Sequence, residues 1–174
     1  MLRKGGFGYL RSRMDNWRQM AQHQMVMLLT DLDRVACPIL LLEDWLGENR
    51  VCPDNLIFRI AEREVESWLL ADHEAFTQLM GKNVKLPEAP DALPDPKQFL
   101  LEQAKKASRD IREDLVSKKG AMARQGLGYN ARLVAWVKTE WCPQRAAGRS
   151  PSLERARRAL DHAAVLLTQR ESEL

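Results

Sequence analysis

Two apolar runs of strand length stand out in the first third of the chain, "MVMLLTDLD" at 25–33 and "NLIFRIA" at 55–61. Each is followed by a polar or helical segment, and this succession is typical of α/β proteins with a mainly parallel sheet. We therefore expect residues 1–84 to form an α/β core.

A helical period of 3.6 residues begins at Arg63 and ends at Gly81, where a glycine is suited to close a helix. Its apolar face carries Val65, Trp68, Leu69, Phe76, Leu79 and Met80. Asp72 falls within that apolar stripe, and a buried carboxylate must be paired or hydrogen-bonded. We predict that an arginine holds Asp72 as a structural tie.

The stretch "KLPEAPDALPDPK" at 85–97 contains four prolines, which cannot sit inside a helix. It predicts an extended surface linker between the core and a second, helical region at 98–174. In that region Ser150 and Pro151 suit the N-cap and first position of a last helix. We expect both regions to pack as one compact domain, with the five tryptophans mainly in apolar helical stripes.

The chain has 174 residues and is 45% hydrophobic, enough to bury the core of one domain. It lacks a run of about 18 to 20 apolar residues, and its basic start lacks an apolar signal region, so we expect a cytoplasmic protein outside the membrane. Three cysteines far apart favour neither a disulfide framework nor a zinc site.

Positive charge is concentrated late in the chain, although the formal net charge is only +3. Residues 97–132 contain nine Lys or Arg against four Asp or Glu. Such a segment suits an anionic partner such as DNA or RNA, or is simply a solvated face. The candidate phosphate contacts are Arg109, Arg112, Lys118, Lys119 and Arg124.

Asp31 and Asp33 follow the first apolar run, and residues two apart in a strand point to one side. We expect both carboxylates at the carboxyl end of the strand, where open α/β sheets bind ligands. Mg²⁺ or Mn²⁺ would offset the repulsion between them. The alternative is that one aspartate caps a turn while the other is solvated.

A second acidic group, Glu62, Glu64 and Glu66, lies where the second strand meets the helix. On a helical projection Glu64 falls beside Trp68 at the edge of the buried face, whereas Glu66 points away. Glu64 is therefore the first candidate ligand and Glu66 the second. Acids in a first helical turn also interact favourably with the helix dipole, which is the structural alternative.

Several segments resemble, in the same order, a bacterial family known as domain of unknown function 4276, which is similar to TOPRIM domains. The resemblance rests on "LLTDLDR", "FRIAEREVESWLLAD", "LPEAPDALPDPK", "GLGYN" and "SPSLERA". It implies a Rossmann-like TOPRIM-type core that binds Mg²⁺ through the D-x-D pair Asp31 and Asp33, completed by Glu64 or Glu66. The chain departs from the TOPRIM pattern because no glutamate precedes Asp31.

The resemblance implies metal-dependent cleavage of nucleic-acid phosphodiesters, in a phage-defence setting with an ATPase partner. The rival hypothesis is a catalytically inactive scaffold that docks on a partner ATPase. The retained carboxylates favour the first hypothesis, whereas the missing early glutamate favours the second, an upstream start of the gene, or a partner that supplies the acid.

Overall fold

Two parallel strands, β1 (Val26–Asp31) and β2 (Leu56–Ala61), form the sheet of the computed structural model, which describes residues 6–49 and 51–172. Val26 pairs with Leu56 at one end of the ladder and Asp31 with Ala61 at the other. Helix α3 (Pro38–Leu46) lies in the connection between the strands. The predicted mixed α/β class and the parallel pairing are confirmed, with a sheet of two strands among the described residues.

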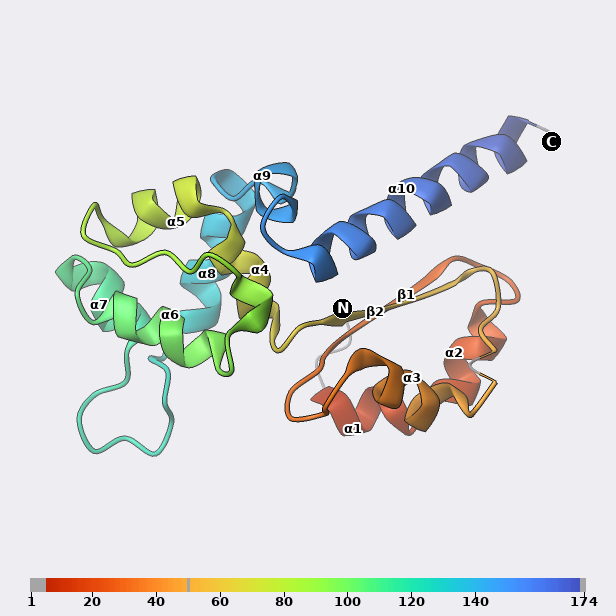
Figure 1. Ribbon diagram of the computed structural model, residues 1–174, viewed down its shortest axis with the longest axis horizontal. Helices are drawn as coiled ribbons and strands as arrows, with labels where there is room; N and C mark the ends of the chain where they lie inside the picture. Colours follow the sequence, from red (N-terminus) through yellow and green to blue (C-terminus); the bar gives the residue numbers. More distant parts are fainter. Residues whose placement is uncertain (1–5, 50, 173–174) are drawn as a thin grey trace.

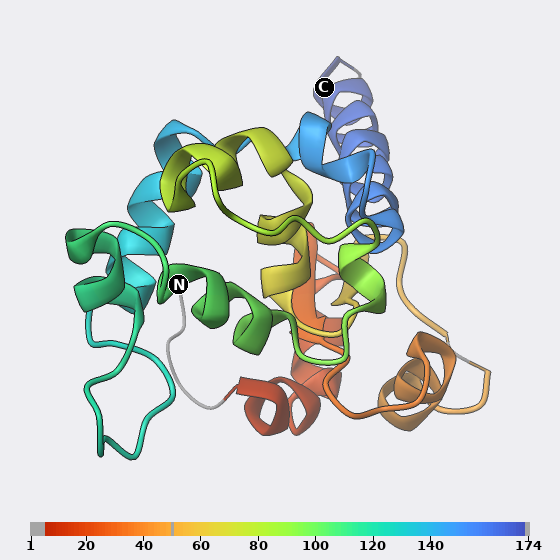
Figure 2. The ribbon, with the colours of Figure 1, turned by 60° about the vertical axis from the view of Figure 1, so that its left-hand side comes forward.

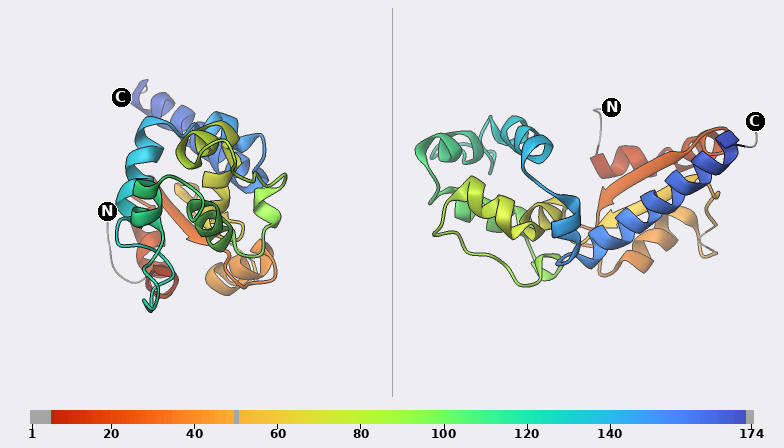
Figure 3. Two further views of the ribbon diagram at one scale, coloured as in Figure 1. Left: turned by 90° about the vertical axis from the view of Figure 1, so that its left-hand side faces the viewer. Right: turned by 90° about the horizontal axis from the view of Figure 1, so that it is seen from above.

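The two faces of the sheet are covered by different helices. On one face Leu28 and Phe58 pack with Trp17 and Trp45 in a core formed with α1 (Gly6–Arg11), α2 (Met14–Met20) and α3. The long helix α10 (Pro151–Ser172) runs over the other face (Figure 1; Figure 3, right). Alternate residues of a strand face opposite sides, so each strand contributes to both layers.

The helical body beside the sheet is built from shorter elements (Figure 2). They are α4 (Val65–Ala71), α5 (His73–Met80), the 3₁₀ turn η1 (Pro90–Ala92), α6 (Pro96–Ala104), α7 (Arg109–Leu115), α8 (Tyr129–Thr139) and α9 (Pro143–Ala147). Its core contains Phe76, Leu100, Leu115 and Trp136. Each of these side chains is buried, so the body has a core distinct from that under the sheet.

The segment at 85–97 packs against the protein and is not the extended surface linker that its prolines predict. Pro87, Pro90 and Pro96 are buried, and η1 lies within the segment. Pro96 is the first residue of α6, where a proline needs no hydrogen-bond partner for its nitrogen. The Asp95 carboxylate caps this helix by accepting a hydrogen bond from Gln98 N at 2.8 Å.

The helix predicted from Arg63 to Gly81 is divided at Asp72 into α4 and α5. Asp72 has φ −84° and ψ 83°, and its carboxylate caps α5 by accepting from Ala75 N at 3.3 Å. Gly81, with φ 97°, ends α5 as predicted. The predicted tie of Asp72 to an arginine is confirmed, because Arg145 donates to both of its oxygens.

Helix α4 lies between the two halves of the molecule and is buried on more than one side. Leu70 belongs to the core of the helical body, whereas Trp68 and Ala71 pack with Leu153 and other residues beneath α10. A helix buried on several sides need not show a single apolar stripe. Its amino end meets the carboxyl ends of both strands and so positions the acidic residues.

Helix α10 begins as its sequence predicts, with Ser150 Oγ accepting a hydrogen bond from Leu153 N at 3.2 Å. The expected burial of the tryptophans is also confirmed, since Trp17, Trp45, Trp68 and Trp136 are buried and Trp141 is half-buried. Even α10, with 22 residues, lacks the apolar stretch needed to cross a membrane, and the same holds for the other helices in the described part of the chain.

Candidate acidic site at the carboxyl end of the sheet

Asp31 is the last residue of β1 and stands at the junction of the sheet with α4. Its half-buried carboxylate accepts a hydrogen bond from Val65 N, the first residue of α4, at 2.8 Å. Burial raises the pKa of Asp31 to about 6, and the negative charges of Glu66, Asp33 and Glu64 add to the shift although the Val65 bond opposes it. Four carboxylates, Asp31, Asp33, Glu64 and Glu66, therefore interact here; we call them the acidic cluster.

Asp33 lies beyond the strand, in a turn, with a left-handed φ of 49°. Its backbone N–H donates to Arg63 O at 2.8 Å, and its side chain is exposed. The expectation that a continuous strand aims both aspartates at one spot is wrong, because β1 ends at Asp31 and the backbone then turns.

The two aspartates also line different hollows beside Phe7 of α1. Asp31 lines a hollow of about 230 Å³ together with Leu10, Thr30 and Val65. Asp33 lines an open hollow of about 530 Å³. The two carboxylates are thus close enough to interact electrostatically but face separate spaces.

Glu64 precedes α4 in an extended conformation, with φ −137° and ψ 156°. The predicted position beside Trp68 on one helix face is therefore wrong, because Glu64 lies outside the helix. Its Oε2 accepts a hydrogen bond from the backbone N–H of Lys97 in the first turn of α6, at 2.8 Å. Burial raises the pKa of Glu64 above its ordinary value; the Lys97 bond opposes this shift, and the nearby Glu66 and Asp95 charges add to it.

Glu66 points into the protein and is only 7% exposed, contrary to the prediction that it faces away from the buried side. The prediction failed because α4 packs on several sides. Glu66 Oε1 accepts a hydrogen bond from the Tyr129 hydroxyl at 2.8 Å and lies 3.5 Å from Lys97 Nζ. Lys97 Nζ also stands 4.9 Å from the centre of the Tyr129 ring. Burial, followed by the Glu66 charge and hydrogen bond, raises the pKa of Tyr129 well above its usual range.

Lys97 and Tyr129 are functional candidates that sequence reasoning missed. The signal for Tyr129 was the "GLGYN" segment, whose glycines pack against α7. A Cβ at Gly126 would lie 2.3 Å from Asp114 O, and one at Gly128 would lie 2.7 Å from Asp114 Oδ1. Glycine therefore permits the close approach that brings Tyr129 to the acidic cluster.

Glu62 lies outside the acidic cluster. Its carboxylate pairs with Arg155 of α10, and its backbone N–H is 3.5 Å from Ser152 Oγ. Glu62 therefore links the end of β2 to α10, and its charge is already compensated.

The basic candidates occupy two positions relative to the acidic cluster. Lys118, Lys119 and Arg124 are exposed in the loop between α7 and α8, drawn in teal in Figure 1, which an antiparallel bridge between Val116 and Gln125 closes. Arg124 pairs with Asp95 at 2.9 Å, at the same end of α6 as Lys97. This pair ties the loop to the helix end that contacts Glu64 and Glu66.

Arg109 and Arg112 belong to α7 rather than to the loop. Arg109 pairs with Glu113 at 2.7 Å, and Arg112 is exposed. Neither makes a hydrogen bond or ion pair with the acidic cluster among those found within residues 6–49 and 51–172. The structure therefore ties the loop, more directly than α7, to the acidic cluster.

Metal-binding capacity depends on whether several ligands converge. In the described ranges, no group of three or more His, Cys, Asp or Glu side chains is placed to hold a metal ion. The carboxylates have the donor chemistry that Mg²⁺ requires, but Asp33 would have to turn toward Asp31. Comparisons with protein-family models, curated proteins and solved structures found no match to this chain.

Proposed function

We propose that the acidic cluster binds Mg²⁺ or Mn²⁺ and that the protein cleaves nucleic-acid phosphodiester bonds. The observation that supports this most is the raised pKa of Asp31, about 6, to which burial and three neighbouring carboxylates contribute. Such uncompensated negative charge at the carboxyl end of a parallel sheet favours a bound cation. Oxygen ligands are those that Mg²⁺ prefers.

Asp31 and Glu64 would hold the cation, with Asp33 joining them from the neighbouring turn. Backbone N–H groups of Val65 and Lys97 each donate to one oxygen of these two carboxylates and so fix their positions. A bound divalent cation would supply the charge that activates a water and stabilises the leaving oxygen. Glu66 would act differently, by positioning Lys97 and Tyr129 at the edge of the site.

The loop between α7 and α8 would hold the nucleic-acid backbone. Lys118 and Lys119 are exposed there, and Arg124 links the loop to α6. Contacts of this kind neutralise phosphates without reading sequence, and they weaken as salt rises. This role extends to Arg109 and Arg112 only if the substrate also reaches α7.

A second candidate function is a non-catalytic subunit that docks on a partner ATPase. It is favoured by the lack, in the described ranges, of three converging metal ligands and by the neutralisation of Glu66 by Lys97. Met122 and Leu127 are fully exposed in the loop between α7 and α8, where a partner protein would cover them.

The test is cleavage of supercoiled plasmid and of single-stranded RNA with Mg²⁺ or Mn²⁺, compared with EDTA. We expect metal-dependent cleavage that Asp31→Asn abolishes. The matched control is Asp15→Asn, which removes a carboxylate that is 93% exposed on α2. Absence of cleavage with either metal, or equal cleavage by Asp31→Asn, would reject the enzyme and favour the non-catalytic subunit.

A further inference from the structure

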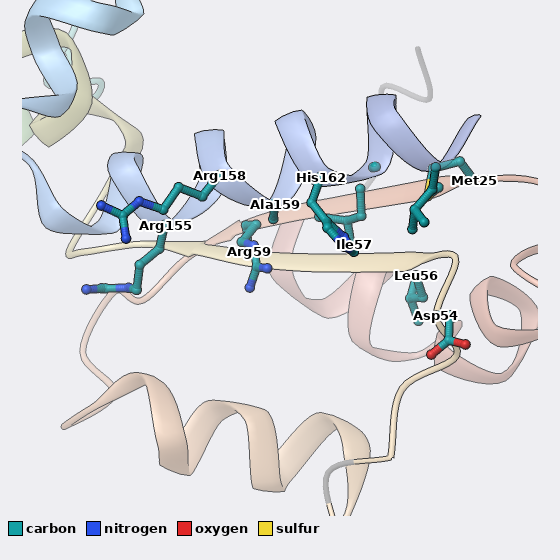
Figure 4. A pocket seen from close by; sticks show the side chains of 11 residues that line it. Met25, Asp54, Leu56, Ile57, Arg59, Arg155, Arg158, Ala159 and His162 are labelled. Carbon is teal, nitrogen blue, oxygen red and sulfur yellow. The ribbon is translucent and has the colours of Figure 1, made fainter. Parts of the chain in front are cut away.

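Helix α10 and strand β2 enclose a pocket of about 520 Å³ that is separate from the acidic cluster (Figure 4). The walls carry Arg59 from the middle of β2 and Arg155, Arg158 and His162 from α10. Positions three, four and seven residues apart lie on one side of a helix, so the α10 residues face the same space. The only acidic side chain among the pocket residues is Asp54, which lies at the far end of the pocket in Figure 4.

Arg59 is the central feature of this pocket because its half-buried guanidinium is incompletely satisfied. Nη1 donates to Phe58 O at 3.2 Å, whereas Nε is buried and has no hydrogen-bond partner in the described part of the chain. Burial lowers the pKa of Arg59, and the positive charge of Arg155 lowers it further. A buried donor without an acceptor costs free energy, so an anion placed here would relieve that cost.

The two arginines on α10 have donors to spare. Arg155 pairs with Glu62, and Arg158 Nε donates to Glu154 Oε1 at 2.8 Å. A guanidinium has five N–H donors, so these bonds leave others for a second acceptor. The Arg158 side chain is 78% exposed and lies at the same end of the pocket as Arg155 (Figure 4).

The opposite end of the pocket is apolar. Met25, Ile57, Ala163 and Leu166 line it, and Figure 4 places Met25 away from the arginines. The pocket therefore combines a cationic end with an apolar end, at a volume within the usual range of small-molecule sites. Planar guanidinium groups are suited to bind phosphate oxygens in pairs.

We propose that this pocket binds a phosphomonoester attached to a flat apolar group, as in a nucleotide, with the phosphate at Arg59 and the ring near Met25 and Leu166. The ligand is either a free nucleotide or the phosphorylated end of a nucleic-acid strand, since both present the same groups. The proposal rests on the pocket alone and does not require metal binding at the acidic cluster.

The test is isothermal titration of the full chain with AMP, adenosine and a 5′-phosphorylated oligonucleotide, each without divalent metal. We expect AMP to bind and adenosine to bind much more weakly. Arg59→Gln should weaken AMP binding about tenfold or more, since it removes charge-assisted hydrogen bonds. Binding of the oligonucleotide only when it is phosphorylated would identify a strand end as a second source of the ligand.

Two further variants separate loss of binding from loss of folding. Arg158→Gln changes a largely exposed side chain and should keep the thermal melting temperature while weakening AMP binding severalfold. Arg149→Gln removes an exposed guanidinium outside the pocket and should bind AMP as the unmodified protein does. Equal affinities for AMP and adenosine, no AMP binding at all, or unchanged AMP binding by Arg158→Gln and a folded Arg59→Gln would overturn the proposal.

Discussion

Replacing Asp72 by asparagine should destabilise the protein substantially, because this carboxylate joins three parts of the helical body. Asp72 is 0% exposed and ends α4. Its oxygens accept from Arg145 Nε at 2.9 Å and Nη2 at 2.7 Å, from Cys142 N at 2.7 Å and from Ala75 N at 3.3 Å. Asparagine keeps one acceptor oxygen and turns an NH₂ group toward donors, so at least one bond becomes a clash of donors.

The expected cost is set by the burial of Asp72 and the partial exposure of its partner. Removing one member of a fully buried pair costs about 3–5 kcal/mol. The Arg145 side chain is 40% exposed and also donates to Glu140 O at 3.0 Å, so water and this carbonyl partly compensate it. We therefore expect a loss near the lower limit, about 3 kcal/mol, which lowers Tm by about 6–12 °C in a chain of this size.

Urea unfolding and thermal melting, both followed by circular dichroism, measure the effect. Glu74→Gln is the matched control, since Glu74 lies 3.5 Å from the same arginine but its side chain is 63% exposed. We expect Glu74→Gln to change the unfolding free energy by less than about 1 kcal/mol. A melting temperature for Asp72→Asn within about 2 °C of the unmodified protein would refute the structural role of Asp72.

The same variant predicts a pH dependence. Burial alone would raise the pKa of Asp72, but hydrogen bonds from Arg145, Cys142 N and Ala75 N outweigh it and leave the pKa below its ordinary value. A carboxylate with a lowered pKa in the folded state contributes stability above its unfolded pKa of about 3.9 and loses it as pH falls through the folded pKa. The stability difference between Asp72→Asn and the unmodified protein should therefore shrink below about pH 4, and a difference that stays constant down to pH 2 would contradict this assignment.

Two other substitutions test how the "GLGYN" segment is built. Gly126→Ala should lower the urea midpoint because its Cβ would lie 2.3 Å from Asp114 O, whereas Gly8→Ala has no atom within 4 Å and should not; equal midpoints would rule out the close approach. Tyr129→Phe removes the 2.8 Å hydrogen bond to Glu66 and should cost about 1.5–3 kcal/mol, so an unfolding free energy equal to that of the unmodified protein would show that this bond is not formed in solution.

Local chemistry predicted the features that depend on neighbouring residues. The two strands, the glycine at the end of α5 and the serine cap of α10 follow from patterns within a few residues. The arginine tie of Asp72 was also predictable, because a carboxylate in an apolar stripe needs a charged partner. The identity of that partner was not predictable, since Arg145 lies 73 residues away.

The acidic cluster shows why the rest could not be predicted. A helical projection placed Glu64 inside and Glu66 outside, but α4 begins only at Val65 and is packed on several sides. Lys97 and Tyr129, which contact Glu66, lie 31 and 63 residues further along the chain. Such partners are set by the packing of α6 and α8 against α4, which no local pattern reports.

Titration of Mn²⁺ into the purified chain is the most direct test of the proposed cation site. We compare the unmodified protein with Asp31→Asn and with Glu62→Gln, a neighbouring acid whose charge Arg155 already compensates. The account predicts saturable binding of Mn²⁺ that Asp31→Asn abolishes and Glu62→Gln retains. Identical titration curves for the unmodified protein and Asp31→Asn would contradict the site and leave the non-catalytic function as the better proposal.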